Sequence, residues 1–420
     1  SYTYLQIFKD TPNTFVEKFF TNEDTQRLLF LAKAKFPEVI IPYLRIMSIN
    51  GAFAHDELSK LSSYMHTISS QNLDYDNDTE SDTIILKNGL YVNPPYEQNK
   101  DVLLYLPEST RGKLVPTADP KTEAAIFQFN YNGWALIGRI MQNVSGFEED
   151  EEVLVTILEL LSNTLGSVDY ETSVDILESL SSFVDNGDIL EIILKLFEQS
   201  LHQRNIRVLT PVADFLISLV GNFPQIVWSH LVRSDLLEHG GRGGLIATIL
   251  GSVETVSGDY EFTISLLKLL NELVLNCISA PEDWTTQKNE VIPKFTSHAV
   301  QVFESFIYWN YKNSYQKFQI GTLIIDTFSK ILYSVYGIDP ESEINKKVTK
   351  SLATSASKVI KSFTNSFPDV RTIKPIIAAV ELLDQTPAAF DTSGRVGFWF
   401  DQWSRASLEF SKLVVSIRSV

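Results

Sequence analysis

The chain has 420 residues, of which 44% are hydrophobic and 21% charged, as in folded globular proteins rather than disordered ones. Its 35 basic and 52 acidic residues give a formal net charge of −17. This acidity argues against nucleic acid or anionic lipid as the main ligand, and it favours soluble partners with basic segments. The length suits two or three compact domains, or one elongated repeat array.

Cysteine content and hydropathy narrow the cellular context. The single cysteine, Cys277, cannot form an internal disulfide, which indicates a reducing compartment such as the cytosol or nucleus. No apolar run approaches the roughly 20 residues that span a bilayer, so we predict no direct membrane insertion. The first residues, SYTYLQIFKD, lack the pattern of a signal peptide. Because the chain starts without methionine and ends on a helical pattern, we expect it to be part of a longer protein.

Two different regions are predicted before residue 136. Residues 1–70 are assigned to a helical segment, and residues 71–135 to an acidic loop followed by a β-rich insertion. The stretch QNLDYDNDTESD holds five acidic residues and no basic one, which is typical of a solvated loop. Its Asp74, Asp76 and Asp78 begin like a calcium loop, but the loop glycine and closing glutamate are missing. Short β-prone runs broken by Gly and Pro follow, as in TIILKNGLYVNPP.

From residue 136 to residue 420 the sequence predicts helix after helix joined by short turns. Apolar residues recur at helical spacing, and each series ends in a polar or glycine break such as VDNGD or GNFP. The fold class is therefore mainly α: an α-solenoid of stacked, irregular HEAT- or armadillo-like helix pairs, with a small inserted β-rich segment. The apolar series include Leu154, Ile157, Leu158, Leu161 and Leu165; Leu266, Leu267, Leu270, Val274 and Cys277; and Ile320, Ile324, Phe328, Ile331 and Val335.

A Phe-Pro pair recurs at 36–37, 223–224 and 367–368. Proline suits the first position of a helix, where its missing N–H costs nothing. The recurrence indicates either generic helix starts or decayed helical repeats, and its unequal spacing gives no fixed period.

The glycine run HGGRGG at 239–244 is the most conspicuous candidate for chemistry. A phosphate-binding loop needs Lys followed by Ser or Thr after its last glycine, whereas Leu245 and Ile246 stand here. The His-Gly-Gly of an esterase oxyanion hole is present, but the G-x-S-x-G nucleophile turn is not. We therefore predict a helix end followed by a tight turn. No catalytic residue, cofactor or metal site is predicted, and the chain is not expected to be an enzyme.

Two aromatic clusters exceed what one helical face needs. They are YWNYKNSYQKF at 308–318 and GFWFDQW at 397–403. Packing between adjacent helices is the favoured explanation, and a groove for apolar or Phe-Gly peptide anchors is the alternative, because Trp and Tyr are favoured as binding anchors. The candidate partner-binding residues are Trp309, Tyr311, Tyr315, Phe398, Trp399 and Trp403.

Two stretches resemble the large inner-ring scaffold nucleoporins of the nuclear pore complex. One is GGLIATILGSVETVSGDYEFTISLLKLLNELV at 243–274, and the other is LPESTRGKLVP with AAIFQFNYNGWALIGRIMQN within 106–143. Together they cover about a fifth of the chain. The SGDYEFT wording is closer to the smaller of the two large paralogues, and the larger paralogue stays open.

The resemblance implies an importin-like α-solenoid without enzymatic activity, located in the nucleus at the nuclear envelope. Its implied partners are adaptor and linker nucleoporins of the inner ring, with transport factors and Phe-Gly segments as further candidates. It also implies a small Src-homology-3-like barrel, for which 81–131 is the candidate segment. Two rivals stay open at this point: a soluble karyopherin-type transport receptor, and a hydrolase built around the glycine run.

Overall fold

The computed structural model describes residues 18–69, 73–78, 83–92, 104–115, 122–144, 151–185, 187–237, 253–279, 286–336, 352–361 and 395–419. The chain divides into two compact units, residues 1–196 and residues 197–420.

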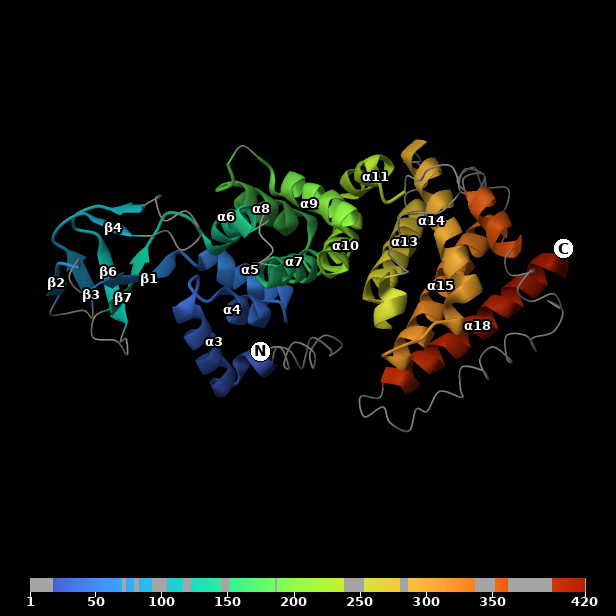
Figure 1. Ribbon diagram of the computed structural model, residues 1–420, viewed down its shortest axis with the longest axis horizontal. Coiled ribbons are helices and arrows are strands. Elements are labelled where there is room, and N and C mark those ends of the chain that lie inside the picture. The colour runs from blue at the N-terminus through green and yellow to red at the C-terminus, as the bar shows by residue number, and fades with distance from the viewer. Residues whose placement is uncertain are drawn as a thin grey trace. The chain divides into compact units, whose positions relative to one another are not determined.

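The first unit combines short helices with a β-rich region (Figure 1). Helices α4 and α5 pack on α7, and α6 packs on α8. Side-chain caps define where several of these helices begin: Asn22, Asn50 and Asp169 each accept a hydrogen bond from a backbone N–H in the first turn. The helices are α3 (Glu23–Lys35), α4 (Ile40–Met47), α5 (Gly51–Lys60), α6 (Gly133–Val144), α7 (Glu151–Leu165), α8 (Tyr170–Ser181) and α9 (Ile189–Gln203), which contains the boundary between the units.

The strands of the first unit form two antiparallel sheets. A five-stranded sheet has the order β1-β7-β6-β3-β2, and a separate hairpin pairs β4 with β5. The bounds are β1 Ser63–Ser69, β2 Tyr75–Asp78, β3 Thr83–Leu86, β4 Leu90–Val92, β5 Leu104–Leu106, β6 Arg111–Val115 and β7 Thr122–Gln128. Both sheets contribute to one apolar core, made of Ile68, Leu73, Ile84, Leu86, Leu90, Val92, Leu106, Ala125 and Phe127. The predicted β-rich insertion is therefore present.

Two segments near this sheet differ from the sequence prediction. Residues 63–69, assigned to the N-terminal helical segment, form strand β1, and residues 75–78, assigned to a solvated loop, form strand β2. The acidic strand is tolerated because Tyr75 packs against the sheet core. In addition, the Lys87 ammonium lies 2.9 Å from the Asp76 carboxylate and neutralises part of its charge.

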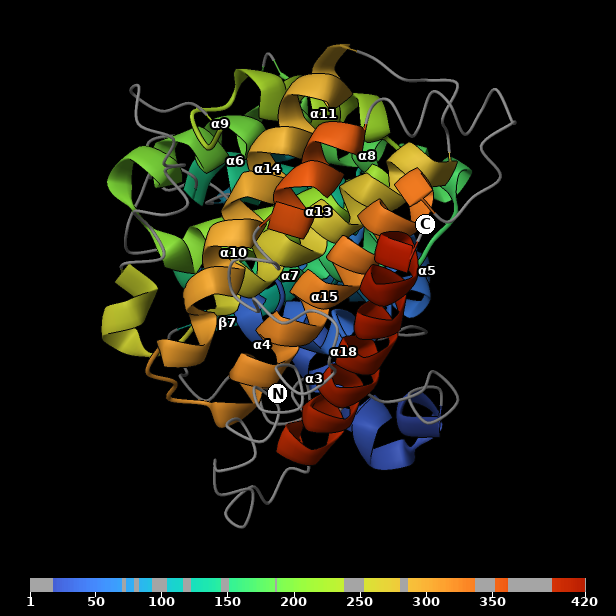
Figure 2. The ribbon, with the colours of Figure 1, turned by 90° about the vertical axis from the view of Figure 1, so that its right-hand side faces the viewer.

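The second unit is a stack of longer helices. Helices α10, α13, α15 and α18 pack in that order, each on the next, while α11 packs on α14. Figure 2 shows α18 running alongside α15. The bounds are α10 Ile206–Val220, α11 Pro224–Arg233, α13 Glu261–Ser279, α14 Thr286–Ser305, η3 Phe306–Tyr308, α15 Ser314–Tyr336 and α18 Arg395–Ser419, with a further helix over 352–361. The chain is thus mainly α, with stacked helices, as predicted.

The predicted apolar faces are confirmed where the structure describes them. Leu154, Ile157 and Leu158 are buried in α7, and Leu266, Leu270 and Cys277 in α13. Burial of such faces supplies the main driving force for stacking helices.

The Phe-Pro prediction holds at one of its three positions. Pro224 is the first residue of α11, as predicted. Pro37 is not a helix start: α4 begins at Ile40, and Pro37 lies in the turn after α3. The third pair, at 367–368, lies outside the described residues.

Among the described residues, one helix is long and apolar enough to cross a membrane by length and composition alone. This helix is α13, and 67% of its most apolar window is buried inside the protein. Such burial is what a core helix of a helical stack shows.

Candidate protein-interaction surfaces

The six aromatic residues predicted to bind partners occupy different environments in the second unit. Trp403 is buried, Phe398 is exposed, and the remaining four, Trp309, Tyr311, Tyr315 and Trp399, are half-buried. They therefore do not form one open aromatic groove, and each group has its own role.

Trp309 and Tyr311 belong to an aromatic joint centred on Tyr260. The rings of Tyr260 and Trp309 stack with centroids 4.8 Å apart, and the Tyr311 ring lies 4.8 Å from Tyr260. The Tyr260 hydroxyl donates to the carbonyl of Asn310 at 3.0 Å, and the Tyr311 hydroxyl donates to that of Phe306 at 2.7 Å. Because the hydroxyls of Tyr260 and Tyr311 are satisfied within the chain and the Trp309 ring stacks on Tyr260, these side chains connect neighbouring elements.

Gly258 allows the two segments of this joint to meet. Its φ of +70° lies in the left-handed region that favours glycine. Its carbonyl accepts a hydrogen bond of 2.7 Å from the Lys312 N–H, and a Cβ at this position would come within 3.1 Å of the same nitrogen. The glycine of the SGDY motif is thus required by backbone geometry.

A buried carboxylate and a buried amide complete this joint. Glu254, 2% exposed, accepts hydrogen bonds from the backbone N–H of Phe262 at 2.8 Å and of Thr263 at 3.2 Å, so it caps the first turn of α13. Burial raises the pKa of Glu254 to about 7. Gln316 accepts from the Tyr260 N–H at 3.2 Å and donates to the carboxylates of Asp259 and Glu261. We call residues 254–263 and 309–316 the Tyr260 joint.

The second motif of the family resemblance forms a comparable joint in the first unit. Tyr131 stacks on Tyr64 and Phe183, with centroids 5.3 and 4.8 Å apart. The next residue, Asn132, accepts from the Ala135 N–H at 3.0 Å and starts α6, whose Trp134 is completely buried. We call this cluster the Tyr131 joint. Both recognised motifs therefore act as structural connections.

Trp403 is part of the core between α15 and α18. It is 3% exposed, and its ring meets that of Phe306 edge-on at 5.8 Å. Gly321 on α15 makes room for it, since a Cβ there would come within 2.5 Å of the indole ring. A partner cannot reach this tryptophan in the folded chain.

Two aromatic side chains of the predicted clusters at 308–318 and 397–403 are exposed. Phe398 is 57% exposed on α18, with its ring against Trp399 at 5.3 Å. Tyr308, which was not among the predicted residues, is 79% exposed. Tyr315 is engaged with Arg395, whose guanidinium lies 5.5 Å from its ring centroid.

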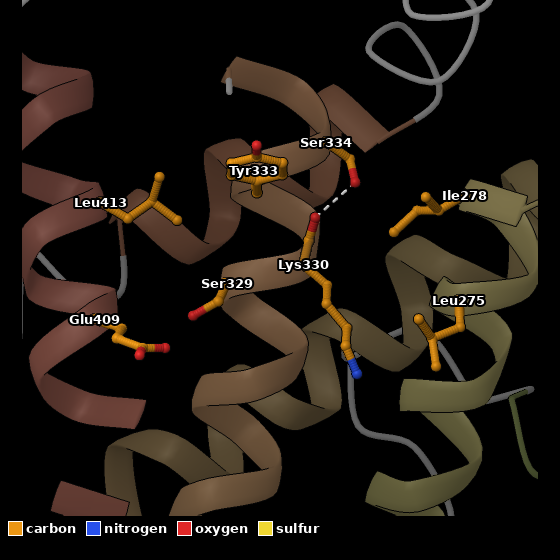
Figure 3. Close-up of a pocket in the computed structure, with 8 residues that line it drawn as sticks. All are labelled: Leu275, Ile278, Ser329, Lys330, Tyr333, Ser334, Glu409 and Leu413. Carbon is orange, nitrogen blue, oxygen red and sulfur yellow. Dashed lines mark hydrogen bonds between the residues drawn. The ribbon is translucent and has the colours of Figure 1, made fainter. Parts of the chain in front are cut away.

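A surface groove crosses α15 between α13 and α18 (Figure 3). Its volume is about 630 Å³, within the range of roughly 300–1,000 Å³ typical of ligand sites. Its lining residues are Leu275, Ile278, Ser329, Lys330, Tyr333, Ser334, Glu409 and Leu413. We call it the α15 groove.

The sequence prediction missed the α15 groove because its residues fall between helical faces. Tyr333 is 58% exposed, although it lies within a helix whose core face is Ile324, Phe328 and Ile331. The sequence did contain a signal: Tyr333 is a large side chain that lies two positions after Ile331 and therefore off the apolar face of the helix.

Charge in the α15 groove is unevenly compensated. The Lys330 ammonium lies 2.7 Å from the Asp326 carboxylate and 2.8 Å from the Asn271 amide oxygen. The Ser334 hydroxyl donates to the Lys330 carbonyl at 2.7 Å. The Glu409 carboxylate, in contrast, makes no ion pair with any lysine or arginine that the structure describes.

Three side chains with potential reactivity, His230, His298 and Cys277, are buried. Burial lowers the pKa of His230 and of His298 to about 4, which keeps both neutral near pH 7. Burial also raises the pKa of the Cys277 thiol to about 12, so it carries no nucleophilic thiolate. Within the described ranges no three His, Cys, Asp or Glu side chains converge as metal ligands. The glycine run at 239–244 lies outside those ranges.

Comparison with known proteins places this architecture in a family. The family model for nucleoporin Nup188, N-terminal subdomain III, matches residues 124–420, and the model for the Nup188 N-terminal region matches residues 1–75. The chain is 32% identical over 414 residues to nucleoporin NUP188 of Saccharomyces cerevisiae, covering 86% of this chain. It is 23% identical over 409 residues to nucleoporin nup184 of Schizosaccharomyces pombe, covering 90% of this chain. The chain spans about a quarter of the length of these two relatives.

Proposed function

The chain belongs to the Nup188 family of nucleoporins, and we propose that it acts as a non-enzymatic scaffold of the inner ring of the nuclear pore complex. Family membership gives its location, the nuclear pore complex at the nuclear envelope, and confirms the smaller paralogue favoured by the sequence. In this role it binds short segments of adaptor and linker nucleoporins, and so supports nucleocytoplasmic transport.

The observation that carries this proposal is the α15 groove on the second unit. A scaffold needs a preformed surface that accepts part of another chain, and apolar grooves between helices are a recurrent way to bind short segments. Leu275, Ile278 and Leu413 supply apolar walls that are already in place without a partner. The two family motifs, by comparison, are used internally as the Tyr260 and Tyr131 joints.

Irregular architecture supports a scaffold over a karyopherin-type receptor. Helices range from 8 residues in α4 to 25 in α18, and an antiparallel sheet interrupts the helical order of the first unit. Transport receptors of the karyopherin class are built from regular repeats of similar length.

The test is capture from nuclear-envelope extract with the tagged chain as bait. We expect inner-ring adaptor or linker nucleoporins to be recovered equally with added GTP or GDP. An unrelated acidic protein of similar net charge serves as the control bait, so that recovery by charge alone is subtracted. Recovery of cargo proteins in a nucleotide-dependent manner, without pore components, would instead identify a transport receptor.

A further inference from the structure

We propose that the α15 groove receives a short amphipathic helix of a partner protein, with two apolar side chains one turn apart and a lysine or arginine facing Glu409. This inference rests on the proposed scaffold function and specifies the chemistry of the segment bound at that site.

The length of the groove matches one turn of an incoming helix. Its floor is formed by two pairs of residues one helical turn apart on α15, Ser329 with Tyr333 and Lys330 with Ser334. Each wall is also one turn long: Leu275 and Ile278 on α13, and Glu409 and Leu413 on α18. A turn is about 5.4 Å, so the groove accommodates two anchors spaced i, i+3 or i, i+4 on an incoming helix.

The walls of the groove suit an apolar helix face. The side chains that project from its walls are mainly apolar: Leu275 and Ile278 on one side and Leu413 on the other, with Tyr333 exposed between them (Figure 3). Two polar side chains of the floor already have partners, since Ser334 donates to the Lys330 carbonyl and Lys330 binds Asp326 and Asn271. An apolar helix face therefore enters without leaving the Ser334 hydroxyl or the Lys330 ammonium unpaired.

A helix suits this surface better than an extended strand. The hydrogen-bonded floor of α15 offers no free backbone edge for strand addition, because the backbone groups within a helix bond to each other. The backbone groups of an incoming helix are already hydrogen-bonded to each other. Such a helix therefore needs only side chains that fit the groove.

The charge of Glu409 favours a basic residue on the partner helix. Lys330 is neutralised by Asp326 at 2.7 Å, which leaves Glu409 as the charged lining residue without an ion pair to any lysine or arginine that the structure describes. Glu409 is exposed on the wall formed by α18, one turn before Leu413. A basic residue on the partner helix, one turn from the side chain that contacts Leu413, would pair with it.

The experiment begins with a photo-cross-linker in the groove. p-Benzoylphenylalanine replaces Tyr333 in the full chain, and in a matched control it replaces Tyr308, an exposed tyrosine outside the groove. After irradiation in nuclear-envelope extract, mass spectrometry identifies the peptide attached at each position. We expect position 333 to yield a nucleoporin segment with apolar residues at helical spacing and a flanking lysine or arginine, and position 308 not to yield it.

The captured peptide is then synthesised and titrated against the chain and its variants. Leu413→Asp should weaken binding roughly tenfold or more, because it places a charge on an apolar wall, whereas Leu408→Asp on the same helix outside the groove should not. Glu409→Lys, a surface change that leaves packing intact, should weaken binding about two- to fivefold. A peptide whose basic residue is changed to glutamate should bind the Glu409→Lys variant with restored affinity. It should not bind the native chain more tightly.

The outcomes separate this inference from the proposed function. If a nucleoporin segment binds but Leu413→Asp and Glu409→Lys leave its affinity unchanged, the groove is not its site and the inference fails while the scaffold function stands. A segment that is acidic, extended and Phe-Gly-rich, or derived from a second copy of this chain also overturns the inference. If no nucleoporin is captured at all, the proposed function itself fails.

Discussion

Residues 1–196 contain 14 basic and 30 acidic residues, whereas residues 197–420 contain 21 and 22. The net charge of −17 therefore resides almost entirely in the first unit, at −16 against −1 in the second. On α8 the exposed residues Glu171, Asp175 and Glu178 share one helical face. An overall acidity read from composition thus describes one part of the molecule, and the α15 groove lies in the part that is almost neutral.

The joints of the two units differ as well. The Tyr131 joint is a stack of aromatic rings, while the Tyr260 joint adds a buried carboxylate and a buried amide that contacts two further carboxylates. A stack of rings tolerates local change, because each ring pair contributes only about 0.5–1.5 kcal/mol beyond its buried area. A buried polar network is more sensitive, because each unpaired group costs its full desolvation penalty.

The largest expected effect comes from Trp403, which the structure places in the core of the second unit. Trp403→Ala should lower the free energy of unfolding by about 3–5 kcal/mol, because it leaves a cavity between α15 and α18. Phe398→Ala, on the exposed side of the same helix, should change it by less than about 0.5 kcal/mol. Denaturant unfolding followed by tryptophan-independent circular dichroism checks both; equal effects would show that Trp403 is a surface residue.

Features that depend on residues close together in the sequence could be predicted, and features that depend on residues far apart could not. The helical faces were predictable because apolar spacing is local, as for Leu266, Leu270 and Cys277. The Tyr260 joint was not, because Gln316 reaches the Tyr260 N–H across 56 positions of the chain. The same holds for the α15 groove, whose walls come from α13 and α18. The role of Trp403 depends on Gly321, which only the fold brings against it.

The next effect contrasts the two joints directly. Gln316→Glu should lower the free energy of unfolding by about 3 kcal/mol at pH 8, because a third carboxylate would face those of Asp259 and Glu261 without the donated hydrogen bonds. Tyr131→Leu in the first unit should cost about half as much or less, since it removes ring contacts but keeps an apolar side chain. Chemical denaturation of both variants gives the comparison. A Tyr131→Leu loss equal to the Gln316→Glu loss would remove the distinction between the joints.

The Tyr260 joint should also make stability depend on pH near neutrality. The folded pKa of Glu254, about 7, lies above the unfolded value of 4.5, so the folded chain binds a proton that the unfolded chain releases between these values. This site therefore contributes more stability at pH 6 than at pH 8, and the contribution falls as pH rises through 7. His230 and His298 act in the opposite direction below pH 6.5, because their folded pKa values are depressed to about 4.

Comparing the chain with its Glu254→Gln variant isolates this contribution, because the two histidines cancel in the difference. The stability advantage of the native chain over Glu254→Gln should increase as pH falls from 8 to 6. Parallel stability curves for the two proteins over this range would show that Glu254 does not titrate there. Tyr131→Leu is the control from the other joint, and its difference from the native chain should not vary with pH.

The smallest expected effect compares local charge pairs on one helix of each unit. Asp175→Lys on α8 replaces two like-charge contacts with pairs to Glu171 and Glu178, and should stabilise the first unit by about 0.2–0.5 kcal/mol per pair. Asp401→Lys on α18 faces Arg405 one turn away and should be destabilising by a similar amount. Thermal unfolding at low and high salt measures both. Equal signs, or shifts that do not shrink in high salt, would show that these local charge pairs do not determine the stability changes.

Hydrogen exchange with and without the captured nucleoporin peptide tests the central claim most directly: partners bind at the α15 groove, while the family motifs hold the fold together. We predict increased protection of backbone amides over 272–279, 329–336 and 406–413 when the peptide is bound, with no change in residues 254–263 or 126–137. Protection gained at the Tyr260 or Tyr131 joint, with none along α13, α15 and α18, would contradict this account.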